Sequence, residues 1–333
     1  MPHCPTSTIC LLKILVLRFS SIGDIVLTTP VVRALKQQLP NAQIHYVTKK
    51  SFGVVLANNP YIDQLFLLEK DNLNELVKVW QKERYDYVID LHHNLRTLII
   101  KWRLGVKSYS FDKLNWEKWL LVHFKINRMP DLHIVDRYMA TVLPLGVKPD
   151  AQGLDYFIPA ADEVDIASLP SAHQSGYVAI AVGAQHFTKR MPLHKIIELC
   201  EKISSPIVLL GGKEDAAVAE KIVAHFAPTQ PNKIFNACGK FNLNQSASLL
   251  GQARVVYSHD TGLMHIAAAL HKKIYSIWGN TTPLLGMYPY RTEFVVIENK
   301  ELSCRPCSKI GFAACPKKHF KCMNDLDLSV VEK

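Results

Sequence analysis

Three short stretches of this chain place charged side chains beside residues that let a backbone approach a ligand closely. The first ends in Gly23-Asp24, the second carries Lys189 and Arg190, and the third is the turn 260–265. A carboxylate such as Asp24 suits a general base, and a fixed ammonium suits the charge on a departing phosphate. Backbone N–H groups at a helix start bind anions. These groups suit proton transfer beside a bound phosphate.

Each stretch follows a run of apolar, strand-forming residues. These runs are Lys13–Leu17 before Asp24, Val178–Val182 before Lys189, and Arg254–Tyr257 before the turn 260–265. A helical pattern follows each of them. Parallel sheets bind ligands at the carboxyl ends of their strands, so the three stretches are predicted to lie at such ends.

The rest of the pattern alternates strands with helices in both halves of the chain. Further strands are predicted at 43–47, 64–68, 87–91, 207–210, 233–236 and 273–277, and helices at 25–38, 73–82, 193–203, 215–227, 244–250 and 263–269. This alternation predicts an α/β protein with two parallel, Rossmann-like sheets. Proline and glycine punctuate residues 147–170, which divides the chain into domains at 1–160 and 171–333. Neither half contains the glycine signature of a dinucleotide dehydrogenase or of a P-loop NTPase.

The composition is that of a globular protein with an anionic partner. The 333 residues are 48% hydrophobic and 20% charged, with a formal net charge of +10. Residues 96–128 contain eight Lys or Arg against two acids. No zinc finger, recognition helix or RNP pattern indicates a nucleic-acid reader. The apolar run 9–19 lacks the features of a signal peptide, and no run is long enough to span a bilayer, so a cytoplasmic protein is expected.

Several motifs resemble those of bacterial glycosyltransferase family 9, which contains the ADP-heptose:lipopolysaccharide heptosyltransferases. The resemblance rests on Arg18-Phe19-Ser20-Ser21-Ile22-Gly23-Asp24, on 88–96, on 133–138, on the Asp-Thr-Gly-Leu-Met-His segment from Asp260, and on the cysteine-bearing tail. It covers residues 13 to 323. The resemblance implies the GT-B fold, with the two sheets facing a central cleft. It also implies inverting transfer of heptose from ADP-heptose to the inner core of lipopolysaccharide, with no catalytic metal.

The family resemblance assigns the general base to Asp24 and the stabilisation of the leaving diphosphate to Lys189. Position alone favours a different role for Asp24, as the N-cap of the helix that follows it, and the family resemblance reverses that preference. Lys189 and Arg190 could be a solvated pair on a surface loop. Met191 stands where the family has a tryptophan, which affects the expected packing of this loop.

A larger group of residues is expected to bind the donor. By resemblance, Asp260 and His265 contact donor phosphate or sugar hydroxyls, and Phe241 lines the base pocket. Because the carboxylate of Asp260 would repel phosphate, we assign Asp260 to hydroxyls or to backbone N–H groups. The full set of expected donor-binding residues is Ser21, Gly23, Arg190, Glu214, Phe241, Asp260, Thr261, Gly262, Leu263 and His265. Phe241 and His265 also fit an interpretation as ordinary core residues, and Glu214 shares its ribose-binding role with Asp215 as an alternative.

The basic segment of the first half is expected to bind an anionic, lipid-linked glycan acceptor. The residues chosen for this role are Arg96, Lys101, Arg103 and Lys113. Farther along, Trp116, Trp119 and Phe124 share a helical face with flanking lysines. Such a face fits peripheral contact with the inner membrane, although stripes of this kind usually belong to a core.

Two patterns bear on metal binding. The sole Asp-x-Asp, at Asp325 to Asp327, lies in the tail away from any expected strand end, so we interpret it as chance. Cys304, Cys307, Cys315 and Cys322 form half of a zinc signature with two scattered partners. A structural zinc ion and reduced, packed thiols are both compatible with this spacing.

Three other functions fit parts of the sequence. The same fold could use another nucleotide sugar or glycan. A non-catalytic nucleotide-sugar-binding protein would share the anion sites but would not need both Asp24 and Lys189. An oxidoreductase is disfavoured by the missing glycine signature. Turnover of the donor separates these alternatives.

Overall fold

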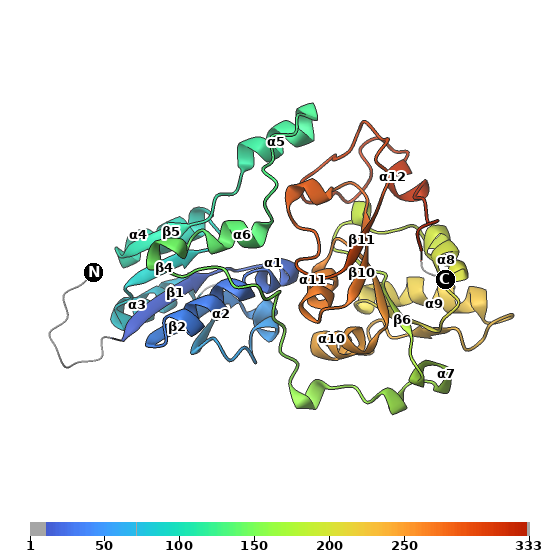
Figure 1. Ribbon diagram of the computed structural model, residues 1–333, viewed down its shortest axis with the longest axis horizontal. Coiled ribbons are helices and arrows are strands. Elements are labelled where there is room, and N and C mark those ends of the chain that lie inside the picture. The colour runs from blue at the N-terminus through green and yellow to red at the C-terminus, as the bar shows by residue number, and fades with distance from the viewer. Residues whose placement is uncertain (1–10, 71, 332–333) are drawn as a thin grey trace. The chain divides into compact units, whose positions relative to one another are not determined.

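The computed structural model describes residues 11–70 and 72–331, which form two compact α/β units. The first unit comprises the chain up to Lys113 together with Ile134–Phe157. The second comprises Leu114–His133 and the chain from Ile158 onward. Each unit is built around one parallel sheet (Figure 1), which confirms the predicted fold class.

The sheet of the first unit has the strand order β3-β2-β1-β4-β5. Its strands are β1 (Leu12–Leu17), β2 (Ala42–Lys49), β3 (Gln64–Leu68), β4 (Tyr87–Asp90) and β5 (Lys107–Ser110). All pairings are parallel, with Leu17 opposite Val47 on one side and Asp90 on the other. The chain leaves β1 toward β2, and later returns to β1's other side with β4. The carboxyl ends of β1 and β4 are therefore the topological switch point, where open α/β sheets bind ligands.

Helices cover this sheet and join its strands. They are α1 (Ile22–Val26), α2 (Thr29–Gln38), α3 (Leu73–Glu83), α4 (Leu95–Leu104) and α6 (Ile134–Met139). The single helix predicted over residues 25–38 is wrong, because the structure has α1 and α2 there. The Thr28 hydroxyl donates to the Ile25 carbonyl and bonds the Tyr46 hydroxyl, while Thr29 donates to the Val26 carbonyl. These threonines end α1 and restart the chain as α2, with Pro30 in the first turn.

The sheet of the second unit has the order β11-β10-β9-β6-β7-β8. Its strands are β6 (Val178–Ala181), β7 (Ile207–Leu210), β8 (Ile234–Asn236), β9 (Val255–His259), β10 (Lys273–Trp278) and β11 (Phe294–Glu298). Strands β6 and β9 are neighbours whose connections run in opposite directions, so their carboxyl ends form the second switch point.

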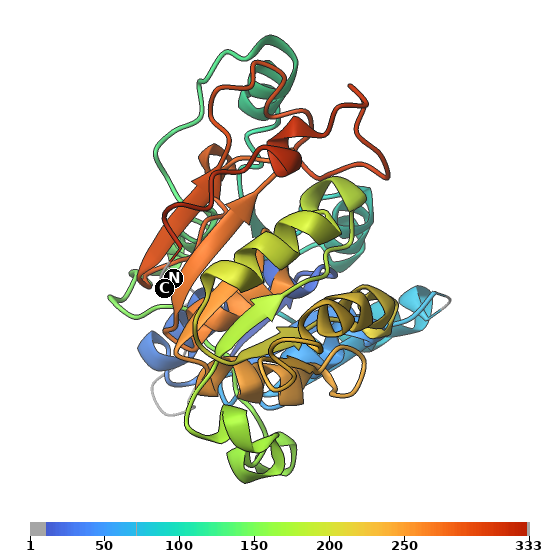
Figure 2. The same cartoon turned by 90° about the vertical axis from the view of Figure 1, so that its right-hand side faces the viewer.

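Helices α8 (Leu193–Lys202) and α9 (Ala216–Phe226) share one apolar core with strand residues and with the C-terminal tail. Figure 2 shows α8 lying across a face of the sheet. Helices α10 (Leu243–Gln252) and α11 (Gly262–Ala269) contact each other, and α11 contacts β9 and β10. The sheet is thus covered by helices as in a doubly wound fold.

The segment Leu114–His133 belongs to the second unit although it precedes the end of the first. The sequence-based division at 1–160 did not include this excursion. The Lys125 ammonium donates to the carbonyls of Cys304 and Pro306, and the His133 ring bonds the Tyr288 carbonyl at 2.8 Å. These bonds to distant residues tie the segment to the second unit, which spacing along the sequence does not reveal.

Helix α5 (Asn115–Phe124) lies in this segment and carries the aromatic stripe. Trp116 and Trp119 stack at 5.0 Å between ring centroids and remain exposed to solvent. The interpretation of the stripe as a core is therefore wrong. Among the residues that the structure describes, no helix has the length and apolar character needed to cross a membrane.

Candidate active site

The first half of the candidate site lies at the carboxyl ends of β1 and β4, in the first unit. Ser21 is the N-cap of α1, and both its N–H and its hydroxyl donate to the Asp24 carboxylate, at 3.2 and 2.9 Å. The other oxygen of Asp24 lies 2.7 Å from a guanidinium nitrogen of Arg18. Gly23 is buried inside the same turn. Asp24 is therefore not the N-cap but the third helical residue, with its carboxylate held between Ser21 and Arg18.

Arg18 organises this end of the sheet. Its guanidinium donates to the carbonyls of Ser20 and Leu91 and to the Tyr138 hydroxyl, at 2.8, 2.6 and 2.9 Å. Burial alone would lower the pKa of Arg18, but the Asp24 carboxylate and nearby tyrosines outweigh burial and raise it. Sequence analysis placed Arg18 in the motif without a role. A positive charge at the end of an apolar strand was the available signal, because such a charge needs a partner when it is buried.

Asp24 stays exposed enough to meet a substrate, since about a quarter of its side chain is accessible. Its ion pair with Arg18 favours the ionised carboxylate, which is the form a general base needs. Helix α1 is only five residues long, so the nearby charge of Arg18 is the stronger stabilising group for this carboxylate. This half-site can accept a proton from a hydroxyl group brought to Asp24.

His92 borders the same half-site. Its ring lies 4.8 Å from that of Phe19, and burial followed by the charge of Arg18 lowers its pKa to about 4. The imidazole is therefore neutral at physiological pH and offers a hydrogen-bonding group without adding charge beside Asp24. His92 lies two residues after the end of β4, and this position near a strand end was the available signal for its placement.

The four cations expected to bind the acceptor differ in their exposure and in the groups that they contact. Arg96 is exposed on α4, and Arg103 donates to the Asn74 side chain at 2.6 Å. Lys101 contacts the buried Asp90 carboxylate at 2.9 Å and the Ser110 hydroxyl at 2.7 Å, so its charge serves the interior of this unit. Lys113 is half-buried at the last residue before the excursion to the second unit. Arg96 and Arg103 are thus the two exposed cations of the four.

The second half of the candidate site lies at the carboxyl ends of β6 and β9. Lys189 ends a short 3-10 turn after β6, and Asp260 directly follows β9. The Lys189 ammonium lies 2.6 Å from the Asp260 carboxylate, which also accepts from the Thr281 hydroxyl at 3.0 Å. The structure therefore brings two predicted site residues into one ion pair. The carboxylate orients the lysine, a role that sequence reasoning did not give to Asp260.

Helix α11 begins beside this ion pair. Thr261 is its N-cap in extended conformation, and Gly262 and Leu263 begin its first turn at half-buried positions. This start presents backbone N–H groups that suit an anion. His265 is buried one turn later, in the same helix.

Arg190 and the turn after β7 lie next along the sheet edge. The Arg190 guanidinium donates to the Ala184 carbonyl at 2.6 Å and lies 3.8 Å from Asp215. Burial raises the pKa of Asp215, although the Gly212 N–H and Arg190 favour its charged form. Glu214 is exposed, unlike Asp215, and is the freer of the two carboxylates to meet a ligand. Phe241 is half-buried before α10, so its side chain is not a closed core residue.

His259 accepts a hydrogen bond from the loop that carries Lys189. The Met191 backbone N–H donates to His259 Nε2 at 3.0 Å, and burial lowers the pKa of this imidazole to about 4. The ring is thus a neutral hydrogen-bond acceptor for Met191, which lies two residues after Lys189. Sequence analysis did not select His259, although its position beside Asp260 at a strand end was a signal.

The C-terminal tail also contacts the loop that carries Lys189, through Phe187 and Thr188. The Thr188 N–H donates to the Phe312 carbonyl at 3.2 Å, and the Phe312 N–H donates to the Thr188 hydroxyl at 2.8 Å. Phe187 stacks on Phe320 with ring centroids 5.1 Å apart. The tail therefore fixes the loop that carries Lys189.

The cysteines of the tail are free thiols in the structure. The Cys307 thiol donates to the Cys304 carbonyl at 3.0 Å, and Cys304 Sγ lies 3.9 Å from the His319 ring. Burial raises the pKa of Cys307 to about 11 and that of Cys322 to about 12. Within the described residues, no group of three or more His, Cys, Asp or Glu side chains is arranged to hold a metal ion.

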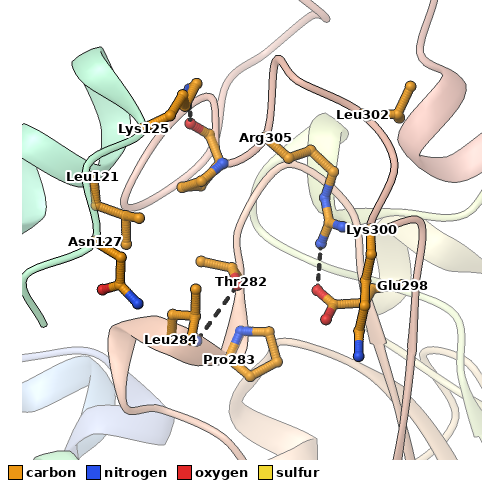
Figure 3. Close-up of a pocket in the computed structure, with 11 residues that line it drawn as sticks. Leu121, Lys125, Asn127, Thr282, Pro283, Leu284, Glu298, Lys300, Leu302 and Arg305 are labelled. Atoms are coloured by element: carbon orange, nitrogen blue, oxygen red, sulfur yellow. Dashed lines mark hydrogen bonds and ion pairs between the residues drawn. The ribbon is translucent and has the colours of Figure 1, made fainter. Parts of the chain in front are cut away.

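A pocket of about 460 Å³ lies within the second unit, between the 114–133 segment and the turn after β10. Figure 3 shows Leu121 and Asn127 on one wall, Thr282 and Leu284 at the base, and Arg305 opposite. Arg305 donates to Glu298 at 2.8 Å and to several backbone carbonyls. None of the predicted site residues lines this pocket. Arg305 pairs with Glu298, and Lys125 bonds the carbonyls of Cys304 and Pro306, which ties the 114–133 segment to the rest of the second unit.

The two half-sites have the composition of a group-transfer enzyme acting on a phosphorylated donor: a held carboxylate in one unit, and a lysine beside a helix start in the other. The sequence profile of "Glycosyltransferase family 9 (heptosyltransferase)" matches residues 74–317. This chain belongs to that family, and it is a glycosyltransferase.

Relatives of known name agree with this assignment. The chain is 26% identical over 298 residues to lipooligosaccharide heptosyltransferase 2 of Haemophilus ducreyi, covering 82% of this chain and 84% of the relative. It is 25% identical over 317 residues to lipopolysaccharide heptosyltransferase 1 of Campylobacter coli, covering 88% and 91%. The prediction of family membership made from the motifs is confirmed.

Solved structures share the fold. A family 9 glycosyltransferase from Veillonella parvula superposes with a TM-score of 0.71 at 22% identity, covering 86% of this chain and 85% of the other. The ADP-heptose lipopolysaccharide heptosyltransferase II of Escherichia coli gives 0.70 at 20% identity, covering 94% and 98%. These likenesses confirm the predicted GT-B type of fold.

Proposed function

We propose that this protein is an inverting heptosyltransferase that moves heptose from ADP-heptose to the inner core of lipopolysaccharide. Relatives that span most of the chain carry names of this activity, and the family is described as heptosyltransferases. The observation that carries the proposal is the pairing of each expected catalytic group with a partner that suits its role. The Asp24 side chain contacts the Arg18 guanidinium, and the Lys189 side chain contacts the Asp260 carboxylate.

In the proposed reaction, an acceptor hydroxyl attacks the anomeric carbon of the heptose while the bond from that carbon to the ADP oxygen breaks. Asp24 takes the proton of the attacking hydroxyl, and the configuration at the anomeric carbon inverts. Arg18 and Ser21 fix the carboxylate, so its lone pair is oriented before the acceptor arrives. This preorganisation avoids reorganisation cost during the transfer.

The ADP leaving group gains negative charge as the bond breaks. Lys189 and the N-terminus of α11 would meet this charge, with Asp260 orienting the lysine. We assign donor binding to the residues of this half-site that sequence analysis selected, with Ser21 and Gly23 contributing from the first unit. Glu214 is proposed for the ribose, because it is exposed where Asp215 is buried.

We propose that the first domain binds the acceptor and the second binds the nucleotide sugar. The acceptor would be an anionic, lipid-linked glycan, and Arg96 and Arg103 offer cations for it. Lys101 supports the interior through Asp90, so its contribution would be to position the end of β4. Peripheral contact with a membrane follows from a lipid-linked acceptor and forms part of the same proposal.

We also propose that catalysis needs no bound metal, because Lys189 and the start of α11 supply the positive charge that a divalent ion would supply elsewhere. A structural zinc ion at Cys304, Cys307, Cys315 and Cys322 is a separate hypothesis. Zinc binding would require thiolates and a rearrangement of these side chains.

The test of the proposed function is a thermal-shift screen of nucleotide sugars, followed by mass spectrometry of lipopolysaccharide from a deletion strain. ADP-heptose should raise the melting temperature more than UDP- or GDP-sugars, and the strain should lack a heptose of the inner core. A glycan of normal composition in the deletion strain would contradict the acceptor assignment. Stabilisation by another nucleotide sugar alone would contradict the donor.

A further inference from the structure

Helix α4 of the first unit presents an apolar stripe to solvent. Leu95, Leu98, Ile99 and Trp102 follow the spacing of one helical face, and their relative exposures are 73%, 57%, 38% and 80%. Trp102 and Leu95 are the most exposed of the large apolar side chains that the structure describes. Four neighbouring apolar side chains on one short helix form a patch rather than scattered surface residues.

The fold of the unit does not use this stripe. The opposite face of α4 packs inward through the buried Thr97 and Ile100. The helix is capped by reciprocal bonds between Asn94 and Thr97, and it ends at Gly105 in the left-handed region. The helix is therefore anchored and terminated by residues outside the stripe, which leaves the stripe free to contact something else.

Positive charge borders the stripe. Arg96 and Arg103 lie on the side of α4 next to it, and the helix contains no acid. Helix α3 packs beside α4, where its Gln81 side chain donates to the Arg103 carbonyl at 3.0 Å. It adds the exposed Lys78 and Lys82, against one exposed acid, Glu75.

The apolar stripe and the cations beside it together indicate which kind of partner α4 binds. A second copy of the chain docked face to face would bring two sets of the same cations together, which costs free energy. An anionic bilayer surface matches both features, because lipid phosphates neutralise the cations while leucine and tryptophan enter the interface. We propose that α4 docks the first unit on a phospholipid bilayer with anionic headgroups. This inference deepens the membrane contact included in the proposed function, but it needs no particular donor sugar.

The proposal is tested by flotation with vesicles of phosphatidylglycerol and phosphatidylcholine, with pure phosphatidylcholine vesicles alongside. Leu98→Ser with Trp102→Ser removes the centre of the stripe. The matched control, Leu143→Ser with Val218→Ser, removes two exposed apolar residues from other elements. Lys78→Gln with Lys82→Gln removes charge alone. All six positions are exposed, so melting temperatures are expected to stay close to that of the unaltered protein.

The unaltered protein and the control should bind the phosphatidylglycerol vesicles in a salt-sensitive manner. The Leu98/Trp102 variant should lose at least about tenfold in partitioning. The Lys78/Lys82 variant should show a weaker preference for anionic vesicles, because Arg96 and Arg103 remain. ADP-heptose turnover on a soluble, deacylated acceptor should not change in either variant, which separates this inference from the proposed function.

Three results would overturn the proposal. One is vesicle binding by the Leu98/Trp102 variant at the level of the control. Another is loss of binding on Trp116→Ser in α5 with no effect of the α4 changes, which would move the membrane contact to the second unit. The third is a dimer in solution that the Leu98/Trp102 variant converts to a monomer, since α4 would then be an interface between copies.

Discussion

His259 is expected to make this protein acid-labile through its buried, neutral ring. Its pKa falls from an ordinary 6.5 to about 4 because the ring is buried. Between these two values the unfolded chain binds a proton that the folded protein does not bind, so stability increases as pH increases through this window. Taking both pKa values, the linkage relation gives a loss of about 2 kcal/mol between pH 7 and pH 5 from this residue alone.

The perturbation is His259→Gln. The amide oxygen of glutamine can take the place of Nε2 and accept the Met191 N–H, but it does not titrate in this range. His259→Leu is the companion change, which leaves that N–H without its acceptor and should cost about 1–3 kcal/mol at any pH. His194→Gln, at an exposed position on α8, controls for replacing a histidine by glutamine.

The assay is urea unfolding of each protein at pH 7 and at pH 5, together with donor turnover at pH 7. The glutamine variant should lose about 2 kcal/mol less than the unaltered protein between the two pH values, because the contributions of other groups cancel in the comparison. The leucine variant should also turn over more slowly, since the loop that carries Lys189 loses a support. Equal losses of stability in the unaltered protein and the glutamine variant would refute the reasoning.

Other predictions concern the two half-sites. Asp24→Asn should keep donor binding and lower kcat at least about a hundredfold, and near-normal turnover would remove Asp24 as the base. Lys189→Met should weaken ADP binding and slow transfer, whereas unchanged kinetics would give the role to Arg190. Turnover should survive EDTA. A loss of turnover that Mg²⁺ or Mn²⁺ restores would contradict a metal-free mechanism. A fall in melting temperature that only Zn²⁺ restores would indicate zinc at the tail cysteines. Arg96→Glu should raise the KM for acceptor with donor binding within a few-fold, and equal damage to both would show that Arg96 does not act on the acceptor alone.

Much of the fold was predictable because its core strands are continuous apolar runs. The run Val178–Val182 predicted β6, and Ile207–Leu210 and Gln64–Leu68 match β7 and β3. Local pattern failed where contacts between distant residues decided the outcome. The break between α1 and α2 depends on Thr28 and Tyr46, and the extra strands β5 and β11 pair with β4 and β10 although no motif marks them.

For the candidate site, residue types at strand ends were sufficient to select Asp24, Lys189 and Asp260. The partners of these residues were not predictable. Arg18 reaches Tyr138 across more than a hundred residues, and Lys101 turns inward to Asp90 instead of outward to a ligand. A pattern along the chain gives the chemistry that a side chain can perform, but not the group that its charge will meet.

The sequence by itself determined the alternation of strands and helices, the family, and the chemical groups at the ends of the strands. These properties follow from local periodicity and from residue type, which each short stretch carries with it. Only the tertiary structure decided which groups are paired, which histidines are neutral, and that α4 and α5 expose apolar side chains. Burial and pairing depend on what the rest of the chain places around a residue, and the free energy of a charge or an apolar side chain depends on those surroundings.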